Sequence, residues 1–163
     1  MTQRSTVHDT FVIKRNFAFK PELVFAAWAS AEAKSHWFAG PKGEWTQKHR
    51  ELEFRVGGRE HLSGTWKGGK VSHFDGQYYD IVPNERIVFS YDMHIDTTRI
   101  SVSLATVELK AAEVGGKAGT KLALTEQGVF LDGFDDAGGR EKGTQGLLDN
   151  LGSYLKSFSS GKK

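Results

Sequence analysis

The chain has 163 residues, of which 38% are apolar, and Lys plus Arg total 22 against 20 for Asp plus Glu. This length predicts one globular domain over residues 1–163, large enough to bury roughly 70% of the surface of its unfolded chain. The charges are interspersed, so we expect no binding to nucleic acid and no contact with a membrane. The chain has no cysteine, which excludes disulfides, thiolate catalysis and the common structural zinc sites.

The first residues do not show the pattern of a signal peptide. They lack the apolar core of a signal peptide, and no window of the chain approaches the length of about eighteen apolar residues that a membrane span needs. We therefore expect a cytoplasmic protein with flexible ends at residues 1–9 and 159–163.

The N-terminal part of the chain predicts one strand and two short helices. Apolar and polar residues alternate over residues 10–19, which is typical of a strand with one buried face. Pro21 suits the start of a helix over residues 21–29, because the first turn does not need its missing amide hydrogen. Ser30 suits the cap of a second short helix that ends near Phe38.

The middle of the chain predicts a long antiparallel meander. Residues 52–58 alternate and then enter a glycine pair, which is typical of a tight hairpin into a second alternating segment. Further alternating runs follow at short intervals, at residues 71–82, 86–95, 100–109 and 121–130. Together with the first strand, these runs predict an antiparallel sheet of six to seven strands.

The last part of the chain predicts loops and one long helix. Gly115, Gly116 and Gly119 indicate a flexible loop between the last two strands, and residues 132–139 form an acidic, glycine-rich loop. An apolar stripe then predicts a helix over about residues 140–158. The stripe consists of Leu147, Leu148, Leu151, Tyr154, Leu155 and Phe158. Only this helix is long enough to cover the meander, so we expect an α+β, helix-grip arrangement with the sheet curved around it.

Several segments resemble the motifs of one family. They are VFAAW at residues 24–28, HWFAGP at 36–41, EFRVGG at 53–58, GQYYDIVP at 76–83, ERIVFSY at 85–91 and the helix at 143–155. Together they are similar to the family related to the activator of the Hsp90 ATPase, within the START-like (SRPBCC) superfamily. The resemblance covers nearly the whole chain and implies the helix-grip fold.

The resemblance implies a ligand-binding or interaction module without a fixed catalytic set. Relatives bind lipids, hormones or polyketides, some catalyse cyclisation or dehydration, and others assist a chaperone, so the function depends on the site. This chain departs from the family where the last helix begins. It has Gly143 and Thr144 where the family often carries Gly-Trp, and the smaller pair predicts room between sheet and helix.

The side chains expected to face that space form the candidate ligand site. Strand alternation places aromatic rings there, and a filled core is the alternative interpretation. Glu60 shares a strand face with Leu62, and Glu126 shares one with Leu124, so both carboxylates are expected inside, where a charge needs a partner. We expect Arg140 to pair with Glu126. The candidate set is Trp28, Trp37, Phe38, Phe54, Glu60, Leu62, Trp66, Phe89, Tyr91, Glu126, Phe130, Arg140, Thr144 and Leu147.

Other motifs point to little further chemistry. No two of the six histidines have the helical spacing of a metal site, so we expect neither a metal nor a cofactor. Asp92 and His94 lie on one strand face and form a candidate proton-transfer pair, for which surface exposure is the alternative interpretation. The chain has no Ser nucleophile elbow, P-loop or dinucleotide fingerprint.

Three functions remain open. The first is binding of a small, largely apolar molecule between sheet and helix, without covalent chemistry, by a monomer or homodimer. The second is interaction with a partner protein such as a chaperone, and the third is a cyclase or hydratase with Glu126, Glu60 or a histidine as base. A continuous cavity favours the first and third, whereas a filled core with an exposed apolar patch favours the second.

Overall fold

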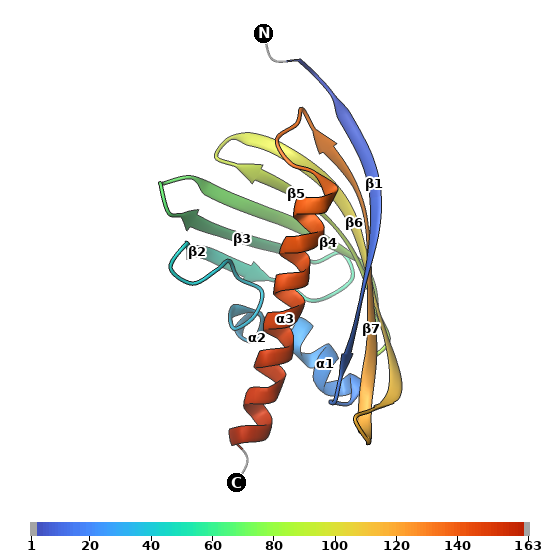
Figure 1. Cartoon of the computed structure of the whole chain (residues 1–163). Coiled ribbons are helices and arrows are strands. Elements are labelled where there is room, and N and C mark those ends of the chain that lie inside the picture. Colours follow the sequence, from blue (N-terminus) through green and yellow to red (C-terminus); the bar gives the residue numbers. More distant parts are fainter. Residues whose placement is uncertain (1–2, 162–163) are drawn as a thin grey trace.

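A computed structural model gives the fold of residues 3–161, with side chains described up to residue 158. The elements in chain order are β1 (Thr6–Phe17), α1 (Pro21–Trp28), α2 (Ala31–Ser35), β2 (Trp45–Leu52), β3 (Arg59–Trp66), β4 (Val71–Val82), β5 (Arg86–Ile95), β6 (Thr98–Val114), β7 (Lys117–Leu131) and α3 (Ala137–Gly161). The seven strands form one antiparallel sheet in the order β1-β7-β6-β5-β4-β3-β2. The sheet curves around α3, and α1 and α2 lie beside the C-terminal half of that helix (Figure 1). The predicted helix-grip fold is confirmed.

The long helix covers the sheet unevenly. Its leucines Leu148, Leu151 and Leu155 are buried in the core. The backbone of α3 packs mainly along β1 and against α1. The concave face of the sheet is therefore less covered around β3 and β4 than around β1 (Figure 1). No helix in the described part of the chain is long and apolar enough to cross a membrane.

The two short helices begin where the sequence predicts. Pro21 occupies the first turn of α1. At the start of α2, the Oγ of Ser30 accepts a hydrogen bond of 3.0 Å from the backbone N–H of Ala33. Helix α2 ends at Ser35, earlier than expected, and turns lead from there through Phe38.

The predicted hairpin at residues 52–58 is wrong in its position. Strand β2 ends at Leu52, and the glycine pair lies in the connection to β3. Gly57 has φ +82°, and a Cβ on Gly58 would lie 2.1 Å from the carbonyl oxygen of Glu53, so both positions need glycine. The connection also pairs with β4, because the N–H of Gly57 donates to the carbonyl of Tyr78 at 2.8 Å. Alternation of apolar residues did not reveal β2, which is a polar edge strand.

The last hairpin is tighter than expected. Gly115 and Gly116, with φ of 59° and 78°, form a turn between β6 and β7, which is typical of a two-residue hairpin connection. Gly119 therefore lies in β7 and not in a flexible loop. A Cβ on Gly119 would lie 2.5 Å from the carbonyl oxygen of Phe17, so glycine allows β1 to approach closely.

Both ends of the chain are more regular than expected. Residues 6–9 belong to β1 and pair with β7. Helix α3 begins at Ala137, because Asp136 caps it by accepting a hydrogen bond of 2.7 Å from the N–H of Gly139. It continues to Gly161, so the acidic loop is shorter than predicted and residues 159–161 are helical. Residues 1–2 and 162–163 lie outside the described residues.

Candidate functional site

Aromatic rings lie directly on the strands of the concave face, at positions where the strands carry glycine. A Cβ on any of three glycines would contact a ring, and glycine lets each ring approach the backbone. The shortest distances would be 1.9 Å for Gly64 and Trp45, 3.2 Å for Gly76 and Phe74, and 3.3 Å for Gly128 and Phe130. The concave face is therefore lined with apolar, aromatic surface.

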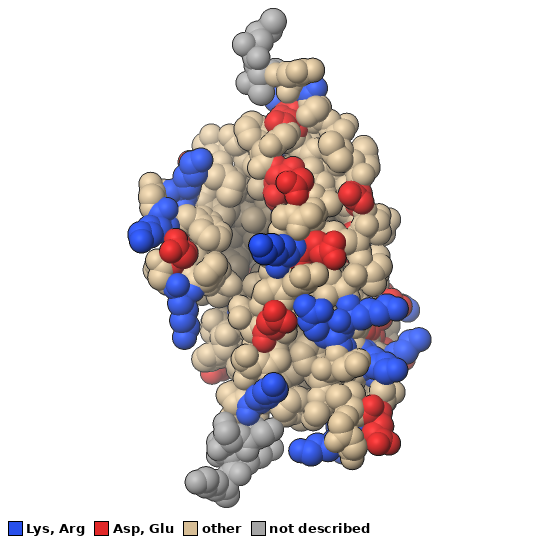
Figure 2. Space-filling model, viewed as in Figure 1, with Lys and Arg blue, Asp and Glu red and all other residues tan. Residues whose placement is uncertain are grey.

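Part of this surface is accessible beside α3. Figure 2 shows a depression next to the helix, over the part of the sheet that Figure 1 labels β3 and β4, and we call it the hollow. Apolar side chains on the concave face lie in register there, with Leu62 opposite Phe74 and Phe74 opposite Met93. Met93 and Trp45 are only half-buried, so the lining retains accessible apolar area.

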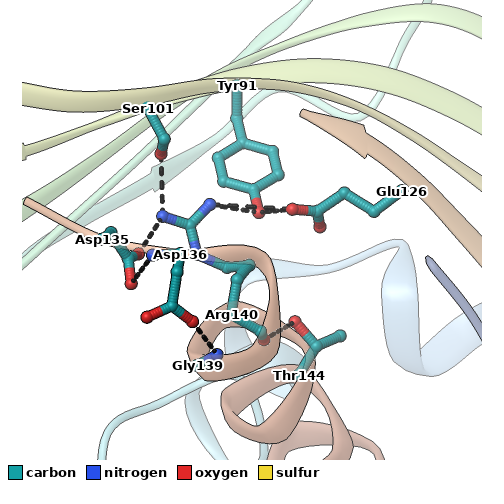
Figure 3. A network of polar contacts seen from close by, with 8 residues as sticks. All are labelled: Tyr91, Ser101, Glu126, Asp135, Asp136, Gly139, Arg140 and Thr144. Atoms are coloured by element: carbon teal, nitrogen blue, oxygen red, sulfur yellow. Dashed lines mark hydrogen bonds and ion pairs between the residues drawn. The ribbon is translucent and has the colours of Figure 1, made fainter. Parts of the chain in front are cut away.

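A polar network connects the start of α3 to the concave face (Figure 3). Nη1 of Arg140 donates to the hydroxyl of Tyr91 at 3.0 Å, and its Nη2 donates to Ser101 at 2.7 Å and Asp135 at 2.8 Å. The Tyr91 hydroxyl donates in turn to Oε2 of Glu126 at 2.7 Å. The phenol thus joins the guanidinium to the carboxylate, whose nearest atoms are 3.6 Å apart. The predicted pairing of Glu126 with Arg140 is confirmed.

Burial controls the protonation of this network. It raises the pKa of Glu126, although the hydrogen bond from Tyr91 and the charge of Arg140 act in the opposite direction. Burial likewise raises the pKa of Tyr91. For Arg140, burial acts to lower the pKa, but Tyr91, Glu126 and Asp135 raise it overall. The network therefore holds a permanent cation, a neutral phenol and a carboxyl group that takes up a proton more readily than usual.

A second buried network fastens α2 to the sheet. Nζ of Lys34 donates to the two carboxylate oxygens of Glu60 at 2.8 and 3.1 Å, and the hydroxyl of Tyr78 donates to the same carboxylate at 2.5 Å. The ammonium group lies 4.5 Å from the ring centroid of Phe38 and 5.4 Å from that of Trp28. Burial lowers the pKa of Lys34, and Glu60 acts against this shift. The network contributes to packing, because all three polar side chains are inaccessible.

By burial, thirteen of the fourteen predicted site residues fall into two groups, and Trp66 is exposed. Eight are buried, namely Trp28, Trp37, Glu60, Leu62, Phe89, Tyr91, Glu126 and Phe130. Five are half-buried, namely Phe38, Phe54, Arg140, Thr144 and Leu147. The filled-core interpretation therefore fits most of the predicted aromatics. Among the predicted residues, accessible ligand contacts are limited to the half-buried group and Trp66.

Two predicted residues lie at the margin of the concave face, at or beyond the end of a strand. Trp66 lies at the end of β3 with 36% of its surface exposed, and its Nε1 donates to Ser72 at 3.0 Å. Phe54 lies in the connection after β2 and packs edge-on against Phe25, with ring centroids 5.6 Å apart. Alternation placed both side chains on an inward face, but it could not show where the strands end.

Sequence reasoning missed Lys34 and Tyr78. A signal for Lys34 exists, because it precedes Trp37 and Phe38 by three and four positions and so shares their helix face. Tyr78 continues the inward alternation of Phe74 in β4. Both signals were present in the sequence, but the pairing with Glu60 joins segments that are distant along the chain.

The candidate pair Asp92 and His94 lies on the opposite, convex face of the sheet. Nδ1 of His94 is 3.3 Å from Asp92, and each side chain is 24% exposed. Asp92 also pairs with Arg99 at 3.1 Å. The pair is therefore separated from the hollow by the sheet.

Two other surface depressions are present in the described structure. One, of about 740 Å³, is lined by residues of α2 and β2 to β4 that include Arg50 and Glu60. The other, of about 570 Å³, lies between the start of α1 and the β6–β7 hairpin. Neither lining includes a residue of α3. The hollow beside α3 is therefore distinct from both depressions.

Comparison with known proteins identifies the family. No curated protein matches the chain. A solved structure from Rhizobium leguminosarum is 44% identical, with a TM-score of 0.87, and the match covers 96% of this chain and 99% of that one. The Mll3558 protein from Rhizobium loti is 43% identical, with a TM-score of 0.81 and coverage of 92% and 99%. The family model described as Activator of Hsp90 ATPase homolog 1-like protein matches residues 18–156, and the chain therefore belongs to this START-like family.

Proposed function

We propose that this protein binds a small, largely apolar molecule in the hollow between α3 and the concave face of the sheet, without covalent chemistry. The observation that carries the proposal is the aromatic lining of a concave face that α3 leaves partly open. Aromatic and aliphatic side chains around a small number of polar groups are typical of small-molecule sites. Membership of a family of ligand-binding and interaction modules supports the same function.

The Arg140 network supplies the polar contact that such a ligand needs. The side chain of Arg140 is 11% exposed, whereas that of Glu126 is 3% exposed. Arg140 is therefore the hydrogen-bond donor of the network that can reach a bound molecule, and Asp135, with 25% of its side chain exposed, is the accessible acceptor. Because Tyr91, Ser101 and Asp135 hold the guanidinium in place, little side-chain entropy is lost when a ligand binds.

The substitution Thr144→Trp tests the proposal. Thr144 is half-buried and lies one turn after Arg140 in α3. Its hydroxyl donates to the carbonyl of Arg140 at 2.9 Å, within the same helix. Loss of this hydroxyl therefore leaves no hydrogen-bond partner in another element unpaired. A tryptophan should fill the hollow, reduce the uptake of an apolar fluorescent dye at least tenfold, and leave the melting temperature unchanged or raised. Native mass spectrometry of the purified parent should show a bound small molecule that the variant lacks.

A convex-face substitution provides the matched control. Lys110→Trp adds the same ring at an exposed residue of β6, away from the exposed apolar residues of that strand, and dye uptake should stay at the parent level. If the space beside Thr144 is already filled, Thr144→Trp should instead destabilise the fold by about 1–3 kcal/mol without changing dye uptake. That result would contradict ligand binding in the hollow.

Binding of a partner protein is the second candidate function. It is supported by exposed apolar side chains on the convex face of β1 and β6, where Val12, Val102 and Leu104 are 49%, 42% and 38% exposed. Leu104→Glu tests this function. If Leu104→Glu loses dye uptake and Thr144→Trp keeps it, the result favours partner binding on the convex face over ligand binding in the hollow.

A further inference from the structure

The convex face of the sheet brings together histidines that are far apart along the chain. His49 of β2, His61 of β3 and His73 of β4 come from three neighbouring strands. The ring centroid of His61 lies 5.7 Å from that of His49 and 5.7 Å from that of His73. His94 of β5 is the register partner of His73. We call these four residues the histidine row.

A carboxylate orients the central imidazole of the histidine row. Nδ1 of His61 is 2.6 Å from Oδ1 of Asp75, its direct register partner on β4. A carboxylate in this position holds the proton on Nδ1, which leaves the lone pair of Nε2 free. The side chain of His61 is 27% exposed, so its ring is partly open to solutes. The same arrangement of carboxylate and imidazole is common behind metal ions in proteins.

We infer that the histidine row binds a divalent transition-metal ion, of the Zn²⁺ or Cu²⁺ class, between His61 and His73, with Asp75 as a positioning residue. An imidazole nitrogen binds zinc at about 2.1 Å, so two imidazoles on one ion have ring centroids roughly 5–6 Å apart. The separation of 5.7 Å between His61 and His73 agrees with this requirement. His49 lies at the same distance from His61, but its Nε2 is already within 3.1 Å of Oε1 of Glu51, which leaves His73 as the second ligand. Neutral imidazoles suit zinc and copper.

The remaining ligands of the ion are water. No three His, Asp or Glu side chains of the described residues already converge on one metal position. The site is therefore a two-histidine site on an open face, which binds more weakly than a closed structural zinc site. It lies on the opposite face of the sheet from the hollow, so it is independent of the proposed ligand binding.

Titration of the full chain, without an affinity tag, with Zn²⁺ near pH 7.5 tests the inference by calorimetry. One ion should bind per chain. His61→Gln and His73→Gln should each weaken binding at least tenfold, because each removes one of two protein ligands. Asp75→Asn should weaken it by about tenfold or more, as expected for a residue that orients a ligand. The matched control His8→Gln changes an exposed histidine on β1 outside the row, and binding should not change.

Electron paramagnetic resonance with Cu²⁺ separates a positioning role from a ligand role. Parent and Asp75→Asn should show two coordinated imidazole nitrogens, and His73→Gln should show one. Equal Zn²⁺ affinity in the parent and the double variant H61Q/H73Q would overturn the inference, as would loss of binding only in His8→Gln. If His61→Gln does not fold, His73→Gln and the imidazole NMR signals of the parent with and without Zn²⁺ decide the question.

Discussion

The two buried networks consist of the same kinds of group, a cation, a glutamate and a tyrosine, but they differ in what covers them. Lys34, Glu60 and Tyr78 are each at most 2% exposed and lie under aromatic rings. Arg140 keeps 11% of its side chain exposed and also binds Asp135, in the loop before α3. A sealed network can only hold elements together. A network with a partly exposed guanidinium can also offer a hydrogen bond to a ligand.

Removal of α3 is expected to have the largest effect on stability, and it separates the two networks. A chain that ends at Gly139 loses Arg140 but keeps the entire Lys34 network. It also loses the buried Leu148, Leu151 and Leu155, and each such leucine contributes about 2–5 kcal/mol, against a total stability of about 5–15 kcal/mol. Circular dichroism should show no cooperative thermal transition. A cooperative transition would mean that the sheet and the Lys34 network are sufficient for folding.

Loss of the lysine is expected to have the next largest effect. Lys34→Ala leaves the carboxylate of Glu60 buried without its cation, which should cost about 3–5 kcal/mol in the free energy of unfolding, measured with urea. The double variant K34M/E60L removes both charges and should recover much of this loss. If the double variant is as unstable as Lys34→Ala, the ion pair is not what makes Lys34 important.

Loss of Glu126 is expected to cost less than loss of Lys34. In Glu126→Ala the guanidinium of Arg140 keeps Tyr91, Ser101 and Asp135 as partners, so the loss should be about 1–3 kcal/mol. Glu126→Gln, which keeps the shape and an acceptor for the Tyr91 hydroxyl, should cost less again. A loss for Glu126→Ala that exceeds the loss for Lys34→Ala would reverse the comparison of the two networks.

The pH dependence of stability should show the smallest effect. The pKa of Glu126 is raised above its usual 4.5, so over a range of pH above 4.5 the folded protein keeps a proton that the unfolded chain has released. The contribution of Glu126 to stability is therefore greatest below pH 4.5, falls as the pH rises through the raised pKa, and is constant above it. The lowered pKa of Lys34 acts with the opposite sign, since its contribution rises as the pH increases toward 10.5.

Urea unfolding between pH 4.5 and 7.5 measures the effect of Glu126. The parent should lose stability over part of this range relative to Glu126→Gln, which cannot titrate at this position. Parallel pH profiles for the two proteins would show that the carboxyl group has the same pKa in the folded and unfolded chains.

The sequence predicted elements best where a pattern is long and apolar. The alternation of Leu122, Leu124 and Glu126 placed the carboxylate inside, and the helical stripe placed Arg140 at the start of α3, so their pairing could be predicted. The alternation around Phe54 wrongly predicted a strand there. The segment is a loop, but a loop that packs against the sheet also points alternate side chains inward. Strand β2 was missed because an edge strand need not bury an apolar face.

Local periodicity alone determined that this chain is a helix-grip protein with Glu60 and Glu126 facing its interior. Tertiary structure alone decided that Tyr91 lies between Glu126 and Arg140, and that four histidines from four strands share the convex face. It also decided which part of the concave face α3 leaves open. The physical reason is that periodicity assigns a side chain to a face, whereas contacts between segments distant in sequence depend on strand order, register and helix packing.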